Sequence, residues 1–313
     1  YDNVVTLGNT LEVVDGLKVL TGVSLVNTHR IAQIAYISVP ILSGGASAVR
    51  YNDWTAAPRL GLNYSPVAGV DLFGTWSQSV NPVATWGYSP STASFNYVKP
   101  LVNQNAFTFE AGGKIRLGRL DGSLTYYRSA VHNEFLTIVV PAGVLDTVPV
   151  TTGYNGSPTL HQGVEAGLNA VLWKGRAGQV RLRQSYTWTD VHFRADATYR
   201  ANTLPGVPAH LYQAELLFDA SRGFYAGGTL RASSGVWADY ANTLKAPAYT
   251  VFGLKAGWRP EGGHWSVFVD AQNLADKRYV SAIGPVSNAA GTDALAFYPG
   301  DGRSVTAGIN LHF

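Results

Sequence analysis

A two-residue periodicity dominates the last stretch of this chain and recurs through most of what precedes it. From Arg303 onward, the apolar residues Val305, Ala307, Ile309, Leu311 and Phe313 alternate with Ser, Thr, Gly, Asn and His. Successive side chains of a β-strand point to opposite faces, so this pattern predicts a strand with one apolar and one polar face. The chain then stops on the aromatic residue without a polar tail.

About thirteen segments carry this kind of pattern, and short turns alternate with long connections between them. Asp15-Gly16 between two apolar alternations is a strong hairpin signal. We expect the other short turns near 65–69, 120–122, 174–178, 221–223 and 261–263. The predicted strands are 4–14, 17–29, 54–64, 70–79, 107–117, 123–135, 160–173, 179–191, 209–218, 224–233, 248–258, 265–273 and the closing stretch to Phe313.

The composition favours a membrane-spanning β-structure over a helical one. Charged residues make up 14% of the chain, whereas soluble domains carry about 25%. The mean hydropathy is nevertheless only +0.02, because alternation hides the apolar wall of a barrel in the average. The longest uncharged run, 31–49, has the length of a membrane helix, but Pro40, Gly44 and Gly45 lie inside it and disfavour that alternative.

The alternation also assigns the two faces of each strand. Leu182 and Trp188 are predicted to face lipid, with Arg181 and Arg183 on the opposite face. An arginine directed into the middle of a bilayer costs about 2–4 kcal/mol, so the apolar set must face outward. Other residues are assigned in the same way: Val180, Tyr186, Phe107, Phe109, Ile115, Leu117, Trp265, Val267, Val269 and Ala271 outward; Ser185, Thr187, Glu110, Lys114, Arg116, Ser266, Asp270 and Gln272 inward. The alternative, a very large soluble sheet, would leave apolar faces uncovered and prone to aggregation.

Several functional classes lack support in the sequence. The absence of cysteine excludes disulfides, thiolate metal sites and cysteine nucleophiles. The net charge of +3, without a basic run, gives no indication of nucleic-acid binding. No two of the seven histidines have metal-ligand spacing, and no catalytic motif is found, so we expect neither a metal site nor an enzyme. The chain also has no methionine and opens inside a strand-like pattern, which suggests part of a longer precursor.

Several motifs, in order along the chain, resemble one protein family. The segment 54–66, with Pro58-Arg59 and Tyr64, precedes an aromatic strand that ends in Ser77-Gln78-Ser79. Further matches are Glu110-Ala111-Gly112-Gly113-Lys114, Tyr126-Tyr127 with Asn133-Glu134, and Gly163-Val164-Glu165. The clearest is 267–279, which contains Asn273-Leu274-Ala275-Asp276-Lys277-Arg278-Tyr279 before the last loop and the terminal Phe strand. Together these motifs are similar to those of TonB-dependent outer-membrane receptors of the siderophore-receptor type.

The resemblance implies an all-β fold, a transmembrane antiparallel β-barrel. Residues 1–313 would form one unit, the C-terminal portion of the barrel, with about 13 C-terminal strands of a 22-stranded barrel and a plug domain outside this sequence. Bacterial barrels have an even strand number, so the partner of the first strand is expected upstream. In this family the last strand is read by the barrel-assembly machinery, which makes Ile309, Leu311 and Phe313 the predicted assembly signal.

The function implied is active import of an iron–siderophore or similar metal chelate across the outer membrane of a Gram-negative bacterium. The TonB-ExbB-ExbD complex would supply energy through the plug, and no cofactor is expected besides the transported ligand. Outer-membrane lipid and lipopolysaccharide would surround the wall. The alternatives are a passive porin-like channel or structural barrel without TonB coupling, and a soluble β-rich binding module. A plug with a TonB-binding segment upstream would favour the receptor.

The long connections contain the candidate ligand contacts, because aromatic rings and arginines suit flat, anionic chelates. These candidates are Trp86, Tyr88, Tyr97, Arg194, Tyr199, Arg200 and Tyr298. The alternative is that such side chains pack the loops onto one another or contact lipopolysaccharide phosphates. Asn273 is expected to end its strand by bonding loop backbone, and Tyr279 to join the outer aromatic girdle. His132 and Glu134 are expected to form a polar pair near a strand end.

Overall fold

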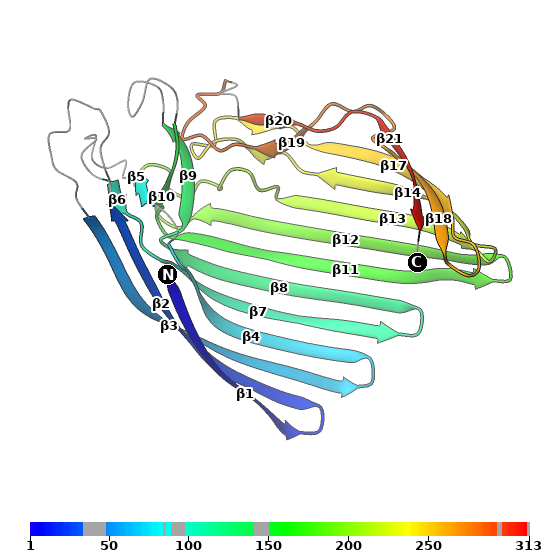
Figure 1. Cartoon of the computed structure of the whole chain (residues 1–313), viewed down its shortest axis with the longest axis horizontal. Coiled ribbons are helices and arrows are strands. Elements are labelled where there is room, and N and C mark those ends of the chain that lie inside the picture. Colours follow the sequence, from blue (N-terminus) through cyan, green and yellow to red (C-terminus); the bar gives the residue numbers. More distant parts are fainter. Residues whose placement is uncertain (34–47, 84–85, 89–97, 141–149, 293–295, 312–313) are drawn as a thin grey trace.

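The protein is a single curved wall of antiparallel strands. A computed structural model describes residues 1–33, 48–83, 86–88, 98–140, 150–292 and 296–311. Thirteen strands form one sheet in the order β1-β2-β3-β4-β7-β8-β11-β12-β13-β14-β17-β18-β21, and each pairs antiparallel with its neighbours (Figure 1). The fold predicted from the alternation is confirmed in class and in strand number. Within the described residues the sheet does not close on itself.

The wall strands are 8 to 20 residues long, and all except β18 and β21 reach the roughly 9–11 residues that a tilted strand needs to cross a bilayer. Their bounds are β1 (Asp2–Val14), β2 (Leu17–Gln33), β3 (Ala48–Val67), β4 (Val70–Asn81), β7 (Gln104–Leu117), β8 (Leu120–His132), β11 (Thr159–Gly175), β12 (Gly178–Phe193), β13 (His210–Ala220), β14 (Phe224–Ser233), β17 (Tyr249–Trp258), β18 (Trp265–Gln272) and β21 (Ser304–Leu311).

Short turns join the strands at one end of the wall, and long connections join them at the other (Figure 1). At the first turn Gly16 has a φ of 77°, and a Cβ there would lie 2.6 Å from the Ser65 carbonyl oxygen, so the position requires glycine. One predicted turn is misplaced. The chain reverses at Gly118 and Arg119, whereas Asp121 and Gly122 already belong to β8 and pair with Arg116 and Ile115.

The register confirms the predicted faces. Arg183 lies opposite Glu215, and Lys255 opposite Asp270, on the face that also carries Glu110 and Lys114. The other face carries exposed apolar side chains, for example Phe109, Val269 and Ile309. At the short-turn end of this apolar face, five aromatic side chains form a belt: Trp173, Phe218, Phe224, Trp258 and Trp265. We call these two surfaces the polar face and the apolar face.

The long connections add structure that the sequence did not predict. They contain four two-stranded sheets: β5 (Trp86–Tyr88) with β6 (Val98–Pro100), β9 (Phe135–Val140) with β10 (Val150–Asn155), β15 (Val236–Trp237) with β16 (Lys245–Ala246), and β19 (Val280–Ile283) with β20 (Phe297–Pro299). Most buried hydrophobic residues lie in or beside these connections, so the hydrophobic core sits at the long-loop end of the wall. The described part of the chain holds no helix of the length and apolarity needed to cross a membrane.

Candidate functional site: the loop cap and the polar wall

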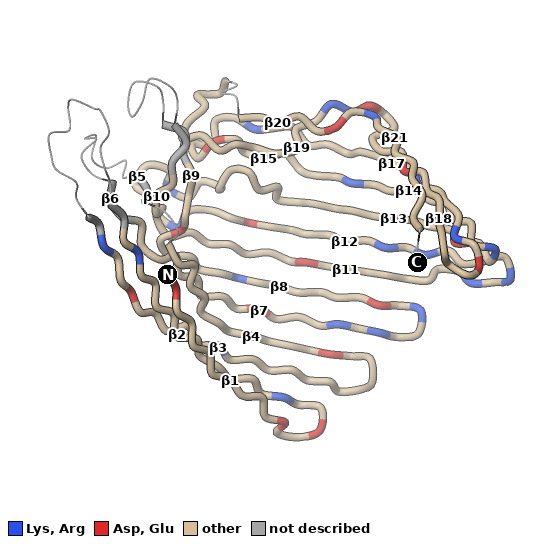
Figure 2. Tube along the Cα trace, in the orientation of Figure 1, with Lys and Arg blue, Asp and Glu red and all other residues tan. Residues whose placement is uncertain are grey.

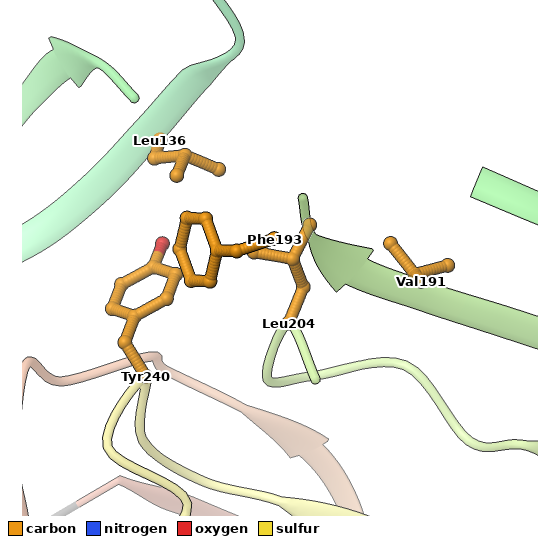
Figure 3. Packing of buried hydrophobic residues seen from close by; sticks show 5 residues of the cluster. All are labelled: Leu136, Val191, Phe193, Leu204 and Tyr240. Carbon is orange, nitrogen blue, oxygen red and sulfur yellow. The ribbon is translucent and has the colours of Figure 1, made fainter. Parts of the chain in front are cut away.

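A hydrophobic cluster joins three of the long connections at this end. Phe193, at the end of β12, is fully buried, and Leu136 of β9, Leu204 and Tyr240 surround it (Figure 3). The Tyr240 hydroxyl donates a hydrogen bond of 3.0 Å to the carbonyl oxygen of Thr137, 103 residues away in the chain. The described parts of these connections, 133–140, 150–158, 194–209 and 234–248, therefore pack together, and we call them the loop cap.

Tyrosines form the polar side of this cluster. Tyr199 stacks on Phe193 with ring centroids 5.5 Å apart and lies 5.7 Å from Tyr240. Burial raises the pKa of the Tyr240 phenol to about 12, even though the hydrogen bond to Thr137 opposes the shift. Burial also raises the pKa values of Tyr154 and Tyr199. These phenols therefore remain neutral at physiological pH; all three rings pack in the cluster, and the Tyr240 phenol also donates a hydrogen bond.

A buried carboxylate ties the last long connection, 273–303, to the loop cap. Asp239 has no exposed surface, and its two oxygens accept hydrogen bonds from the N–H groups of Thr243, Leu244 and Ala289 and from the Thr243 hydroxyl, at 2.6–3.1 Å. Burial alone raises the pKa of Asp239, but these four hydrogen bonds outweigh it and hold the pKa below its usual value. Beside this carboxylate, Ala238, Val286, Ala289 and Ala296 form a second buried cluster.

The candidate ligand contacts on the 194–209 connection divide between surface and core. Arg194 and Arg200 are exposed, whereas Tyr199 is half-buried within the aromatic cluster. Asp196 accepts hydrogen bonds from the N–H groups of Thr198 and Tyr199 and bridges in both directions to the Arg200 backbone. This tight reversal ends at the exposed Arg200, while the Arg194 backbone N–H donates separately to the Pro158 carbonyl.

The last connection confirms one sequence prediction and corrects another. Asn273 is buried; its amide donates to the carbonyl oxygens of Lys277 and Asp301 and accepts from the Lys277 N–H, as expected of a strand-ending residue. The placement of Tyr279 in the outer girdle is wrong. Its ring packs 4.4 Å from that of Tyr249, which lies on the polar face. Tyr298 is 59% exposed and open to a ligand.

The remaining predicted residues lie on β5, on β21 or outside the described residues. Trp86 and Tyr88 lie on β5, which pairs with β6, and Tyr97 lies outside the described residues. Ile309 and Leu311 lie on β21 with exposed side chains on the apolar face, and Phe313 lies outside the described residues. These assignments stay predictions.

The expected pair of His132 and Glu134 does not form. Glu134 instead accepts hydrogen bonds from the Thr159 hydroxyl and from His161 Nε2, the latter at 3.1 Å. The reason is the backbone reversal at Asn133, where φ is 56°, which separates the two side chains. In the parts of the chain that the structure describes, no group of three or more His, Asp or Glu side chains is suited to hold a metal ion.

Below the loop cap, the polar face contains a hollow that sequence reasoning did not single out. It spans β12 to β18 and is lined by Arg183, Gln213, Glu215, Thr229, Arg231, Lys255, Asp270 and Tyr279, among others. Lys255 donates to Glu215 at 2.6 Å, whereas Arg183 contacts only the Asn169 amide oxygen among the described residues. The alternation predicted the direction of these side chains, but their grouping depends on the register of five strands.

A wall of antiparallel strands with one apolar face, one polar face and a cap of joined loops is the architecture expected of part of an outer-membrane receptor barrel. The family described as "TonB dependent receptor-like, beta-barrel" matches residues 4–274, and this chain belongs to that family.

Individual relatives agree with this assignment. The chain is 26% identical over 266 residues to the ferrioxamine receptor of Yersinia enterocolitica, which covers 82% of this chain and 33% of the relative. It is 30% identical over 128 residues to the ferrichrome outer membrane transporter/phage receptor of Escherichia coli, covering 39% of this chain and 17% of the relative.

Solved structures show the same fold. The siderophore receptor PiuA from Acinetobacter baumannii superimposes with a TM-score of 0.76 at 20% identity, covering 99% of this chain and 43% of that protein. The copper transporter OprC gives a TM-score of 0.79 at 15% identity, covering 100% of this chain and 48% of that one. The chain thus spans less than half the length of these relatives.

Proposed function

We propose that this chain is part of an outer-membrane receptor that binds an iron–siderophore complex and imports it with energy supplied through TonB. The observation that carries the proposal is the loop cap, where aromatic side chains fix the arginine-bearing reversal 196–200 above a polar wall. The two sequence relatives described above are named as a ferrioxamine receptor and a ferrichrome outer membrane transporter/phage receptor. No covalent chemistry on the ligand is part of this function, so the protein acts as a transporter and not as an enzyme.

The positions of the candidate residues suggest which parts of the protein serve capture, passage and release of the chelate. The exposed Arg194, Arg200 and Tyr298 offer charge and an aromatic surface to a chelate that arrives from outside. The hollow on the polar face lies on the inward route and offers further hydrogen-bonding groups. Release of the chelate through the barrel requires a conformational change in the part of the receptor that fills the lumen. TonB drives this change. TonB, ExbB and ExbD are accordingly the proposed partners, with lipopolysaccharide around the wall.

The test is uptake of radioactive iron by a strain that produces this protein as its only siderophore receptor. Ferrioxamine B, ferrichrome and ferric citrate serve as probes, each with and without TonB. We expect saturable uptake of at least one chelate that stops when TonB is deleted or the proton gradient is collapsed. Uptake that persists without TonB would instead identify a passive channel, and absence of uptake with intact surface binding would identify a structural or adhesive barrel.

A further inference from the structure

The rim formed by the short turns is strongly polarised in charge. Lys174 and Arg176 at the β11–β12 turn, Arg222 at the β13–β14 turn and Arg119 at the β7–β8 turn are all exposed. The first two turns instead carry Glu12, Asp15 and Asp71, with Lys18 as the one cation at that part of the rim. Figure 2 shows several basic residues and a few acidic ones at the turns of the later hairpins, and mainly acidic ones at the first. The acidic residues of the later turns are Asp121, Asp219 and Glu261.

Hydrogen bonds between neighbouring turns make this basic region continuous. The Ser221 N–H donates to the Ala177 carbonyl at 3.0 Å, and the Arg259 N–H donates to the Gly223 carbonyl at 2.9 Å. The Val171 N–H likewise donates to the Arg119 carbonyl at 2.9 Å. The backbone thus links the turns from β7 to β17 side by side, and their cations form one surface. We call Arg119, Lys174, Arg176 and Arg222 the basic rim.

The basic rim is available to an anion. Within the described residues none of its four cations forms an ion pair, although nearby Arg116 pairs with Asp121 and Arg259 with Asp219. Four uncompensated cations attract phosphates or carboxylates electrostatically, and the attraction weakens as salt screens it.

The aromatic belt lies directly beside the basic rim. The Trp258 indole N–H donates to the Arg222 carbonyl at 3.0 Å, Phe224 stacks on Trp258 at 5.4 Å, and Trp265 meets Trp258 edge-on at 5.0 Å. Such aromatic rings occupy the level where acyl chains meet headgroups. Cations immediately outside that level lie at the depth of lipid phosphates. Binding to a soluble acidic protein would not require the aromatic belt beside them.

We propose that the basic rim binds the headgroups of anionic phospholipids in the leaflet at the short-turn side of the membrane. The cations would contact the phosphate while the belt packs against the upper acyl chain. The inference rests on the proposed membrane placement of the wall. It predicts that phosphatidylglycerol collects along β7–β14 and not along the acidic turns of β1–β4, so the protein organises the lipid along one part of the wall.

The test uses the receptor as its host produces it, purified and placed in phosphatidylcholine bilayers. Trace brominated lipid quenches tryptophan, and Trp173, Trp258 and Trp265 lie in the belt. We compare brominated phosphatidylglycerol with the same fraction of brominated phosphatidylcholine. Near a membrane surface each cation contributes about 1 kcal/mol toward an anionic lipid, so local enrichment of about fivefold or more is expected. The combined Lys174→Gln, Arg176→Gln and Arg222→Gln variant should lose this enrichment, and raised salt should reduce it.

Lys18→Gln is the matched control for Lys174→Gln, since each removes one exposed lysine near a short turn. Only the second should lower the enrichment. Equal quenching by the two brominated lipids, equal effects of both lysine variants, or complete loss with inorganic phosphate at matched ionic strength would overturn the proposal. If the true partner were an acidic protein, the two brominated lipids would quench equally. Quenching by brominated phosphatidylcholine reports membrane insertion itself, so a failure of the membrane placement is recognised separately.

Discussion

The carboxylate of Asp239 links two of the long connections. It accepts four hydrogen bonds, three from its own connection and one from Ala289 in the next. Asp239→Asn replaces one acceptor oxygen by a donor that faces the Thr243 hydroxyl and the Ala289 N–H. Hydrogen bonds to a charged group are each worth about 1.5–3 kcal/mol, so we expect the loops to open more easily by about 2–3 kcal/mol.

Limited proteolysis of the folded protein measures that opening. Cleavage within 234–248 and 286–292 should become about 30-fold faster or more in Asp239→Asn. Asp301→Asn, an exposed aspartate of the same last connection, should leave the rate unchanged. Equal cleavage of all three proteins would show that the carboxylate does not hold the loops together.

Because of Tyr240, the stability of the loop cap is expected to fall at alkaline pH. Its pKa in the folded protein, about 12, lies above its ordinary value of 10.0, because burial favours the neutral phenol. The stabilisation is therefore fully present below pH 10 and is lost as the pH rises from 10 through 12. Spectroscopic titration of phenolate should show a step near pH 12 that is lost in Tyr240→Phe, while the buried phenols of Tyr154 and Tyr199 still titrate above their ordinary pKa. A step near the ordinary value would contradict the packing described for Phe193 and Tyr240.

The two exposed arginines of the cap provide the residue-scale test of ligand capture. Arg194→Gln with Arg200→Gln removes two charges from the cap, and charge-assisted hydrogen bonds of about 1.5–3 kcal/mol each predict at least tenfold weaker binding of an anionic chelate. Surface binding of labelled ferric citrate at low temperature measures this loss. Lys18→Gln at the opposite end of the wall is the control. Unchanged binding in the double variant would remove these residues from the candidate site.

Sequence reasoning succeeded at single residues where the cause was local. Asn273 directly follows an alternating strand, which predicts that its side chain bonds the loop backbone. The structure confirms this, and one of its partners, Lys277, is only four residues away. The position of Tyr279 depends on Tyr249, thirty positions earlier on another strand, and no local pattern reports that contact. The same limit applies to Tyr199, whose partner Phe193 ends strand β12 and whose partner Tyr240 lies in another connection.

At the scale of the strand, four aromatic residues lie directly opposite glycines on the polar face. Phe73 faces Gly112, Tyr127 faces Gly163, Tyr225 faces Gly257, and Phe268 faces Gly308. At Gly308 a Cβ would lie 2.7 Å from the Phe268 ring, which shows that the ring rests on the bare backbone. In each pair the aromatic ring covers the backbone of a glycine, which has no side chain to pack, and thereby fixes the register of the two strands.

The pair Phe268–Gly308 can be tested by a double-mutant cycle. Gly308→Ala should lower the free energy of unfolding by about 1–3 kcal/mol, because the ring must leave its place. In a Phe268→Ala background the same change should cost much less, since the ring is gone. Gly228→Ala, where the nearest atom to a Cβ is 3.9 Å away, is the control and should cost little. Additive effects of the two substitutions would indicate that ring and glycine do not interact.

The wall strands were predictable because each combines period-two alternation with a short turn, and both signals are local. The misplaced turn illustrates the limit. Asp121-Gly122 has the composition of a hairpin turn, yet Gly118 takes the left-handed conformation and Asp121 joins the ladder opposite Arg116. The small sheets such as β9–β10 escaped prediction because their strands are short and the cluster around Phe193, which includes Leu136, packs them in place.

At the scale of the whole molecule, the loop cap and the last connection are expected to move as one body. Ala241 and Ser287 are neighbours through an N–H···O=C bond of 3.1 Å, and the chain has no native cysteine. Ala241→Cys with Ser287→Cys should therefore form a disulfide without perturbing the fold. Uptake of the transported chelate should be the same before and after reduction. Uptake that requires a reductant would show that these loops separate during import.

The order of the sheet is the order of the chain, without a crossover anywhere in the thirteen strands. Every hairpin is therefore a self-contained unit whose two strands find each other through a turn of a few residues. A duplication or loss of one hairpin would change the circumference of the wall by two strands and leave every other register intact. Walls of different width are thus one hairpin insertion or deletion apart, because no strand pairing outside that hairpin has to change.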